Sequence, residues 1–375
     1  TIRERNLISL DKIPYLTAMG ATYDSGDFRK ILNVAIQKSE WNSFESRHLE
    51  SKKRGKHRGI GCALYVEPCG GRRDQLAKIS FQNDCSITVD IGSQSAGQGH
   101  ETLYASIVAQ HLGLNIDQVK IVQGDTSRLN YGRGTSGSRS TSIGGSALMS
   151  ATKIAVKKGI PFAAEILESH ESDLVFTNGC YSVQGTDLSL TFFDMLTKSS
   201  TNNRLSAIIS NLDSEALFNY DEETYPNGCH IVEIEFSKET GELNIINYTC
   251  VDDFGLLINP TLVEGQIHGG ITQGLGQAMM EKVIYDASGQ LLSGSFMDYA
   301  IPRATDLPNF TWSHEGVPCK TNPLGVKGCG EAGCMAAPAA FINAIIHALE
   351  VYSIDDIQMP VTAHSLWQAI NKAKE

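Results

Sequence analysis

The chain has 375 residues, 41% of them hydrophobic, and a formal charge of −11 from 31 Lys and Arg against 42 Asp and Glu. This length suggests two or three domains or one two-lobed unit, and the hydrophobic share is enough to form real cores. The excess of Asp and Glu over Lys and Arg argues against a nucleic-acid-binding protein, because non-specific binding to nucleic acid needs clustered Lys and Arg. No stretch approaches 20 uninterrupted apolar residues, so the sequence does not predict a membrane span.

The nine cysteines are scattered without a CxxC pair. This pattern predicts neither a disulfide framework nor a zinc or iron–sulfur site, and it favours a reducing cytoplasm. The start of the chain, Thr1 to Arg5, has neither an apolar signal core nor an initiator Met and suggests a processed chain or a piece of a longer one.

In the first half of the chain, hydrophobic spacing and glycine punctuation predict a long helix, three strands, and then a helix, a strand and a helix. The expected ranges are 27–54 for the long helix, which Gly55 ends, 59–66, 76–81 and 86–91 for the strands, and 102–112, 118–122 and 146–169 for the rest. Asn178-Gly179 predicts the turn of a β-hairpin.

The segment 213–228 is acidic and has little apolar periodicity, so we interpret it as the crossover between two lobes. Beyond it, the sequence predicts hairpin strands over 231–236 and 243–249 and helices over 260–280, 336–349 and 363–372. Each half thus contains a hairpin, a glycine-rich turn and a helix. We expect an α+β fold with duplicated units and two lobes, 1–215 and 216–375.

Four segments contain glycines and small polar residues in place of the large hydrophobic side chains that form a core. In the first, Gly97 and Gly99 flank Gln98, so the backbone can approach a ligand closely while the Gln98 amide donates and accepts in one plane. A planar heterocycle with an amide edge suits this arrangement. A tight strand-to-helix turn explains the pattern equally well.

The second segment, 132–142, combines Ser and Thr hydroxyls, glycines and two Arg immediately before a predicted helix. Such a segment is typical of a phosphate or pyrophosphate site. The alternative interpretation is a flexible surface loop.

The third segment contains Asp252 and Asp253 and leads into a helix unusually rich in glycine. Glycine weakens a helix, so something must pack very close to this one, either another element or a ligand. The two aspartates are either paired catalytic carboxylates or, more commonly, turn caps.

In the fourth segment, Gly328, Gly330 and Gly333 satisfy the GxGxxG pattern of nicotinamide-dinucleotide sites. The context argues against that function, because no buried strand precedes the pattern and fewer than 45 residues follow it. Glu331, held between glycines four residues after Lys327, instead indicates an exposed general acid or base.

Five motifs occur in a characteristic order: 97–102, 135–141, Asp253 with 263–270, 294–299 and 327–333. Together they resemble the molybdopterin-binding large subunit of the xanthine dehydrogenase, aldehyde oxidase and carbon monoxide dehydrogenase family. The resemblance is to its C-terminal, second molybdenum-binding half, because the loops of the family's first half are not in this chain.

The resemblance implies a molybdenum–molybdopterin cofactor in its cytosine dinucleotide form, with the metal held by the cofactor's own sulfurs and by no protein ligand. It implies that Glu331 is the general base of a hydroxylation that takes oxygen from water. The residues implied to bind the cofactor are Gly97, Gln98, Gly99, His100, Thr135, Ser136, Ser138, Arg139, Ser140, Thr141, Asp253, Phe254, Lys327 and Gly328.

The same resemblance implies an oxidoreductase acting on an aldehyde, N-heterocycle or related small molecule. Its implied partners are the first half of the large subunit, a [2Fe–2S] small subunit and an FAD medium subunit, because this chain has neither clustered cysteines nor a flavin motif. Homodimerisation is left open. A non-catalytic scaffold that binds the pterin cofactor or the partner subunits is the alternative function.

Overall fold

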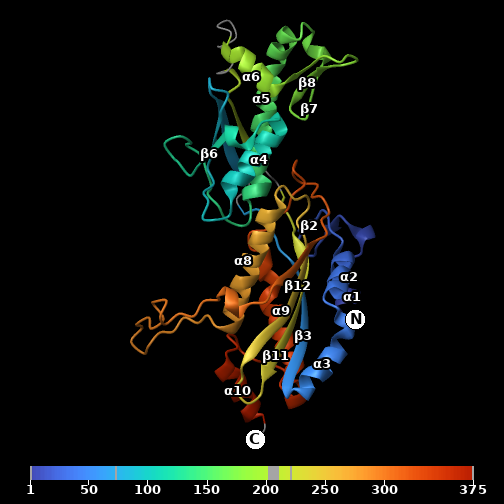
Figure 1. The fold of residues 1–375 in the computed structure, drawn as a ribbon, viewed down its shortest axis with the longest axis vertical. Coiled ribbons are helices and arrows are strands. Elements are labelled where there is room, and N and C mark those ends of the chain that lie inside the picture. The colour runs from blue at the N-terminus through green and yellow to red at the C-terminus, as the bar shows by residue number, and fades with distance from the viewer. Residues whose placement is uncertain (1, 72–73, 202–210, 220–221, 374–375) are drawn as a thin grey trace.

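The computed structural model describes residues 2–71, 74–201, 211–219 and 222–373. Two lobes are stacked along the long axis of the molecule (Figure 1). Each lobe contains a four-stranded mixed sheet covered by helices, with the strand orders β10-β4-β5-β6 and β13-β12-β11-β3. The predicted two-lobed α+β architecture is therefore confirmed.

The upper lobe in Figure 1 is built on β4 (Asp74–Phe81), β5 (Ile87–Ile91), β6 (Val119–Gln123) and β10 (Ser214–Asn219). Helix α4 (His100–Leu112) connects β5 to the parallel strand β6, and α5 (Gly145–Ile166) packs against β4, β10 and α4. Because strand side chains alternate, Ala77, Ile79 and Phe81 of β4 all face this core.

A small three-stranded sheet caps the upper lobe. It contains β7 (Leu174–Thr177), β8 (Cys180–Val183) and β9 (Ser189–Thr191), followed by α6 (Phe192–Thr201). Asn178 and Gly179 both have positive φ, which the tight turn between β7 and β8 requires. The predicted hairpin is therefore confirmed.

The lower lobe is built on β3 (Lys56–Val66), β11 (Asn227–Ser237), β12 (Leu243–Asp253) and β13 (Phe310–His314). Helices α8 (Pro260–Met279) and α9 (Ala332–Leu349) cover one face, while α2 (Phe28–Lys38) and α3 (Phe44–Lys53) cover the other (Figure 1). Alternation along β11 explains the two cores, because Ile231 faces α2 and Val232 faces α9.

The remaining elements are short or peripheral. They are α1 (Ile2–Asn6), η1 (Leu10–Lys12), β1 (Tyr15–Leu16), β2 (Thr22–Tyr23), η2 (Trp41–Ser43), η3 (Ile116–Gln118), the π-helical segment η4 (Ser140–Gly144), η5 (Glu171–Asp173), η6 (Ala304–Asp306), η7 (Glu350–Tyr352) and α10 (Ala363–Lys372).

Helix α9 lies unusually close to β3. A Cβ on Gly59 would sit 2.0 Å from Ala344 O, and one on Gly61 would sit 2.1 Å from Ala340 O. Glycine in the strand and alanine in the helix thus let the two backbones meet. In the described residues, α9 with η7 is the one helix long and apolar enough to cross a membrane, and here it packs against β3 and α8 in the lower core.

The two sheets have the same pairing pattern. In each lobe an antiparallel pair (β4/β5 or β11/β12) is followed by a helix (α4 or α8) and by a strand parallel to the second of the pair. A further antiparallel strand, β10 or β3, completes each sheet on its other side. This shared topology supports the duplicated units expected from the sequence.

Two expected ranges are wrong. The helix predicted over 27–54 is broken into α2 and α3, because Glu40 has φ +51°; Arg47 of α3 donates to Glu40 O (3.3 Å) at the break. The expected crossover over 213–228 contains strand β10, which pairs with β4, and the start of β11. Residues 220–221 of that segment lie outside the described part.

The division at residue 215 does not separate the two sheets. Strand β3, with α2 and α3, belongs to the lower lobe although it precedes the upper-lobe strands in sequence. Strand β10 extends past residue 215 and belongs to the upper sheet. The lobes are therefore assembled from alternating parts of the chain.

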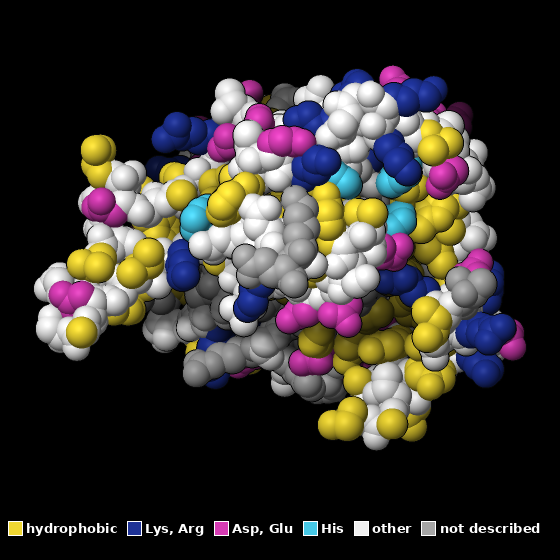
Figure 2. Space-filling view, turned by 90° about the horizontal axis from the view of Figure 1, so that it is seen from below, with side chains coloured by type: hydrophobic (Ala, Val, Ile, Leu, Met, Phe, Trp, Pro, Cys, Tyr) yellow, Lys and Arg dark blue, Asp and Glu magenta, His cyan; other side chains and the backbone are white. Residues whose placement is uncertain are grey.

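An arm, residues 281–303, projects from the C-terminal end of α8 (Figure 1). Figure 2 shows hydrophobic side chains along its surface. The exposed apolar residues of the arm are Val283, Ile284, Tyr285, Leu291, Leu292, Phe296, Met297 and Ile301.

Candidate functional site

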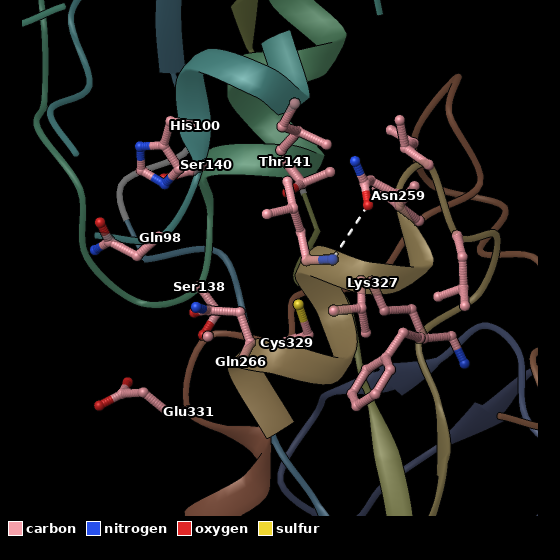
Figure 3. Close-up of a pocket in the computed structure, with 18 of the residues that line it drawn as sticks. Gln98, His100, Ser138, Ser140, Thr141, Asn259, Gln266, Lys327, Cys329 and Glu331 are labelled. Atoms are coloured by element: carbon pink, nitrogen blue, oxygen red, sulfur yellow. Dashed lines mark hydrogen bonds between the residues drawn. The ribbon is translucent and has the colours of Figure 1, made fainter. Parts of the chain in front are cut away.

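A cavity of about 500 Å³ lies where the two lobes meet. The upper lobe contributes Gln98, His100 and the loop 135–141, and the lower lobe contributes the segments 254–266 and 326–331. Figure 3 shows these side chains converging on one space, with Glu331 and Gln98 on one side and Asn259 and Lys327 on the other. The glycine-rich turns of both duplicated units therefore meet at the cavity.

Four helical segments begin at the cavity. Helix α4 starts beside Gln98, η4 starts at Ser140 and continues into α5 at Gly145, α8 starts after Asn259 and α9 starts after Glu331. Asn259 caps α8 by accepting a hydrogen bond from Leu262 N (3.1 Å; Figure 3). Helix N-termini carry unpaired N–H groups and partial positive charge, so their convergence favours an anionic ligand.

Several buried polar atoms of the lining have no hydrogen-bond partner among the described residues: His100 Nδ1, Ser138 Oγ and Ser140 Oγ. Buried polar atoms are normally paired, so these three indicate a polar ligand. Burial also lowers the pKa of His100, which favours a neutral imidazole in this wall. A pterin with a phosphate group has the donors, acceptors and charge that fit this lining.

The predicted turn 97–99 lies at the cavity, but its residues have different roles. Gln98 and His100 line the cavity. Gly99 has φ +73°, and a Cβ there would lie 2.6 Å from Leu262 Cδ2, so this glycine lets the upper-lobe turn approach α8. Gly97 (φ +106°) shapes the turn and does not line the cavity.

All five hydroxyl side chains of the loop 135–141 belong to residues that line the cavity, but Arg139 does not line it. Arg139 is buried (2% exposed) and points away from the cavity. Its guanidinium donates to Gly134 O (3.0 Å), Gln75 Oε1 (3.2 Å) and Asp74 O. Arg139 therefore fixes the loop to β4 and does not line the cavity. The lining members of the loop include Thr135, Ser136, Ser138, Ser140 and Thr141.

Asp253 also lies behind the lining. Its Oδ2 is 2.6 Å from Lys327 Nζ, and its Oδ1 accepts hydrogen bonds from Gly255 N and Val317 N (2.9 Å each). Phe254 beside it does line the cavity. Lys327, the one Lys or Arg of the lining in the described part of the chain, is thus neutralised by a carboxylate, and the helix N-termini supply the remaining positive potential.

Glu331 is exposed at the rim of the cavity, directly before α9. The loop in front of it is held tightly, because a Cβ on Gly328 would sit 2.6 Å from Ser138 O. Gly328 itself does not line the cavity; its N–H donates to Thr224 Oγ1 (3.2 Å). The predicted exposure of Glu331 is confirmed, and among the described residues no strand leads directly into this loop, as a dinucleotide fold would require.

The sequence interpretation missed other lining residues, notably Asn259, Leu262, Gln266 and Cys329. Asn259 before Pro260 is a helix-start signal that could have been used. Gln266 and Cys329 lie inside the resemblance motifs, but only the folded geometry shows that they line the cavity.

A second polar cluster is fully buried in the lower lobe. Ligand atoms of His230, Cys250 and Asp252 lie within 4.8 Å of one another. Both oxygens of Asp252 already accept hydrogen bonds, from Tyr65 OH (2.9 Å) and Trp312 Nε1 (3.1 Å). The Asp252 carboxylate is therefore bound inside the lower lobe, away from the cavity, and does not act with Asp253 as a catalytic pair.

Comparison with known proteins shows what this chain is similar to. Residues 34–308 match the family model of the molybdopterin cofactor-binding domain. The chain is 30% identical to the carbon monoxide dehydrogenase large chain of Hydrogenophaga pseudoflava, over 99% of this chain and 48% of that protein. It is 31% identical to the nicotine 6-hydroxylase large subunit of Paenarthrobacter nicotinovorans, over 98% and 47%.

A solved structure of CO dehydrogenase from Oligotropha carboxidovorans has the same fold, with a TM-score of 0.92 and 30% identity. The match covers 100% of this chain and 48% of that one. The chain thus spans about half the length of the relatives it matches.

Proposed function

The chain belongs to the molybdopterin cofactor-binding domain family, and from this premise we propose that it forms the second, C-terminal molybdenum-binding half of the catalytic subunit of a molybdenum hydroxylase-type oxidoreductase. The similar large subunits are those of carbon monoxide dehydrogenase and nicotine 6-hydroxylase. The proposed reaction is hydroxylation of an aldehyde, an N-heterocycle or a related small molecule with oxygen from water.

The cavity supports this proposal through its own residues. Four helical N-termini face an anionic cofactor, and the hydroxyls of Ser138 and Ser140 with the His100 imidazole offer polar contacts. When bound, the molybdenum cofactor would supply the two-electron redox chemistry. The cofactor's own sulfurs would hold the metal, so no protein ligand is needed.

Glu331 is the general base in this proposal, and its position is the observation that carries it. The carboxylate stands exposed at the cavity rim, on a loop fixed by Gly328 against Ser138 and by Lys327 against Asp253. A carboxylate on a firmly held loop is already placed at the cavity to take the proton of a water-derived oxygen.

We extend the proposal to the cofactor form and the partners. The cofactor is the cytosine dinucleotide form, whose extra phosphate and base would extend along the loop 135–141. The partners are the polypeptide of the first half, a [2Fe–2S] subunit and an FAD subunit that remove the electrons, and the assembly is cytoplasmic. The length ratio of about one half to the matched large subunits supports a missing first half.

The test is Glu331→Gln in the assembled enzyme, with molybdenum content and turnover measured on the same sample. We expect unchanged molybdenum and a turnover lower by about 10²–10⁴-fold, the usual effect of removing a general base. Glu264→Gln, on the exposed side of α8, is the matched control and is expected to keep normal turnover. Near-normal turnover in Glu331→Gln would reject the assignment and favour the non-catalytic scaffold.

A further inference from the structure

A buried tyrosine lies directly behind the start of η4, where Ser140 and Thr141 line the cavity (Figure 3). Tyr104 of α4 is fully buried in the upper-lobe core. Its OH lies 3.1 Å from Ser140 O and 3.1 Å from Ser93 Oγ. A carbonyl oxygen can only accept, so the phenol donates to Ser140 O and the Ser93 hydroxyl donates to the phenol.

The backbone that Tyr104 holds is a π-helical turn. Gly145 N–H donates to Ser140 O, five residues back, as well as to Thr141 O. The Ser140 carbonyl thus accepts two hydrogen bonds, one from Gly145 N and one from the phenol of Tyr104. A single π-helical turn inside a longer helix is rare and is frequently found at a functional site.

Gly144 makes room for the phenol. A Cβ on Gly144 would lie only 2.8 Å from Tyr104 OH, so any side chain there would displace the hydroxyl. Burial raises the pKa of Tyr104, and the phenol therefore keeps its donor hydrogen at neutral pH. The contact between Tyr104 and η4 thus depends on glycine at position 144.

The turn after β5 that carries Ser93 also holds the other end of the loop 135–141. Gln94 N–H donates to Thr135 Oγ1 (3.2 Å), and the Thr135 hydroxyl donates to Gln94 O (2.6 Å). The Ser140 hydroxyl, in contrast, has no partner among the described residues. The loop is therefore fixed at both ends through its backbone and through Thr135, while the Ser140 hydroxyl is left for a ligand.

We propose that Tyr104 is a positioning residue for the cofactor: its hydroxyl holds the Ser140 carbonyl in the π-helical turn, and this turn presents the Ser140 hydroxyl to the polar part of the ligand. The inference rests on the proposed function, because it takes that ligand to be the molybdenum cofactor. The turn itself is a property of the chain and can be measured without cofactor.

Tyr104→Phe removes the hydroxyl and keeps the ring, and the chain offers a matched control in Tyr181→Phe. Tyr181 is equally buried in the same core, and its OH donates to Val156 O (2.7 Å) of α5, which does not line the cavity. Both variants lose one buried hydrogen bond from a phenol to a backbone carbonyl. We therefore expect similar decreases in melting temperature.

The two variants should differ at the turn and at the cofactor. Hydrogen-exchange mass spectrometry of the 375-residue chain should show faster exchange of the 140–145 amides in Tyr104→Phe and wild-type exchange there in Tyr181→Phe. In the assembled enzyme, Tyr104→Phe should release molybdenum roughly three- to tenfold faster on dialysis, the usual effect of one lost hydrogen bond. Tyr181→Phe should release it at the wild-type rate.

Unchanged exchange of the 140–145 amides in Tyr104→Phe, or equal molybdenum release from the two variants, overturns the proposal, because the hydrogen bond would then act on stability alone. Gly144→Ala displaces the phenol from the other side and should act as Tyr104→Phe does, so it gives an answer even if Tyr104→Phe does not fold. A wild-type assembly that holds no molybdenum would reject the proposed function, and this positioning role with it, whatever the exchange shows.

Discussion

Lys327 and Asp253 form a fully buried ion pair between the end of β12 and the loop that carries Glu331. Lys327 Nζ lies 2.6 Å from Asp253 Oδ2, and neither side chain is exposed. Lys327 Nζ also donates to Ser25 O (3.3 Å), so the pair connects three segments distant in sequence. The Lys327 ammonium therefore also fixes the backbone that presents Glu331, in addition to lining the cavity.

Lys327→Met is therefore expected to destabilise the chain by about 3–5 kcal/mol, because it leaves the Asp253 carboxylate buried without a cation. Denaturant unfolding monitored by circular dichroism measures this loss. The double variant Lys327→Met/Asp253→Asn should recover part of it, since no bare charge remains.

The matched control is Lys30→Met. Lys30 Nζ lies 2.8 Å from Glu315 Oε2, but the Lys30 side chain is 55% exposed, so only a small change is expected. Equal losses in Lys327→Met and Lys30→Met would show that burial of the ion pair does not matter.

Arg139 and Ser138 are neighbours with opposite expected phenotypes. Arg139→Ala removes the hydrogen bonds that tie the loop to β4 and should lower the melting temperature of the chain. Ser138→Ala keeps the backbone and a Cβ but removes an unpaired hydroxyl from the cavity, so it should lower cofactor content without lowering the melting temperature. The reverse pattern would show that Arg139 binds the cofactor.

The sequence predicted the local features of the site better than the directions of its long side chains. Turn glycines, hydroxyls before a helix and a carboxylate between glycines can each be recognised from a few neighbouring residues of the sequence. The direction of Arg139 depends on Gln75, 64 positions away in β4. The Arg47 side chain likewise pairs with Glu233, 186 positions away, and no local spacing signals either contact.

The glycines of α8 show the same limit. The sequence predicted close packing against this helix without saying which glycines needed it. A Cβ on Gly270 would lie 2.9 Å from Gly333 Cα at the start of α9, whereas one on Gly265 would meet nothing within 4 Å. The close approach is therefore made by one face of α8.

Gly270→Ala is expected to destabilise the chain by about 1–3 kcal/mol and to displace the start of α9, where Glu331 lies. Gly265→Ala, in the same helix, should stabilise it by about 0.5–1 kcal/mol, because alanine favours the helix and nothing opposes its methyl group. Thermal unfolding of the two variants side by side tests the difference, and equal effects would contradict this packing.

Glu67, which is buried directly after β3, makes stability depend on pH in a defined direction. Burial raises the pKa of its carboxyl to about 7 in the folded chain, against about 4.3 when unfolded, so the folded state binds the extra proton between these values. Its stabilising contribution is full below about pH 4.3 and is lost as the pH rises through 7. Glu67→Gln should therefore gain about 2–3 kcal/mol relative to wild type between pH 5 and 8.5 in urea unfolding. A constant difference across this range would show that Glu67 does not titrate there.

The arm, residues 281–303, exposes more apolar surface than its own contacts can cover. Phe296 is 86% exposed and Met297 is 94% exposed. The described hydrogen bonds of the arm are mainly internal, such as Leu292 N to Ile284 O (2.8 Å), so they hold its shape without shielding these side chains. Exposed apolar patches of this kind drive association in water.

We therefore expect the isolated chain to self-associate as its concentration rises, and Phe296→Ser/Met297→Ser to weaken that association. Sedimentation velocity over a concentration series, at constant salt, measures the change. Met19→Ser is the matched control, because Met19 is also 94% exposed but lies outside the arm. If it weakens association as much as the double variant, general hydrophobicity and not the arm is responsible; a monomeric wild type would contradict the prediction outright.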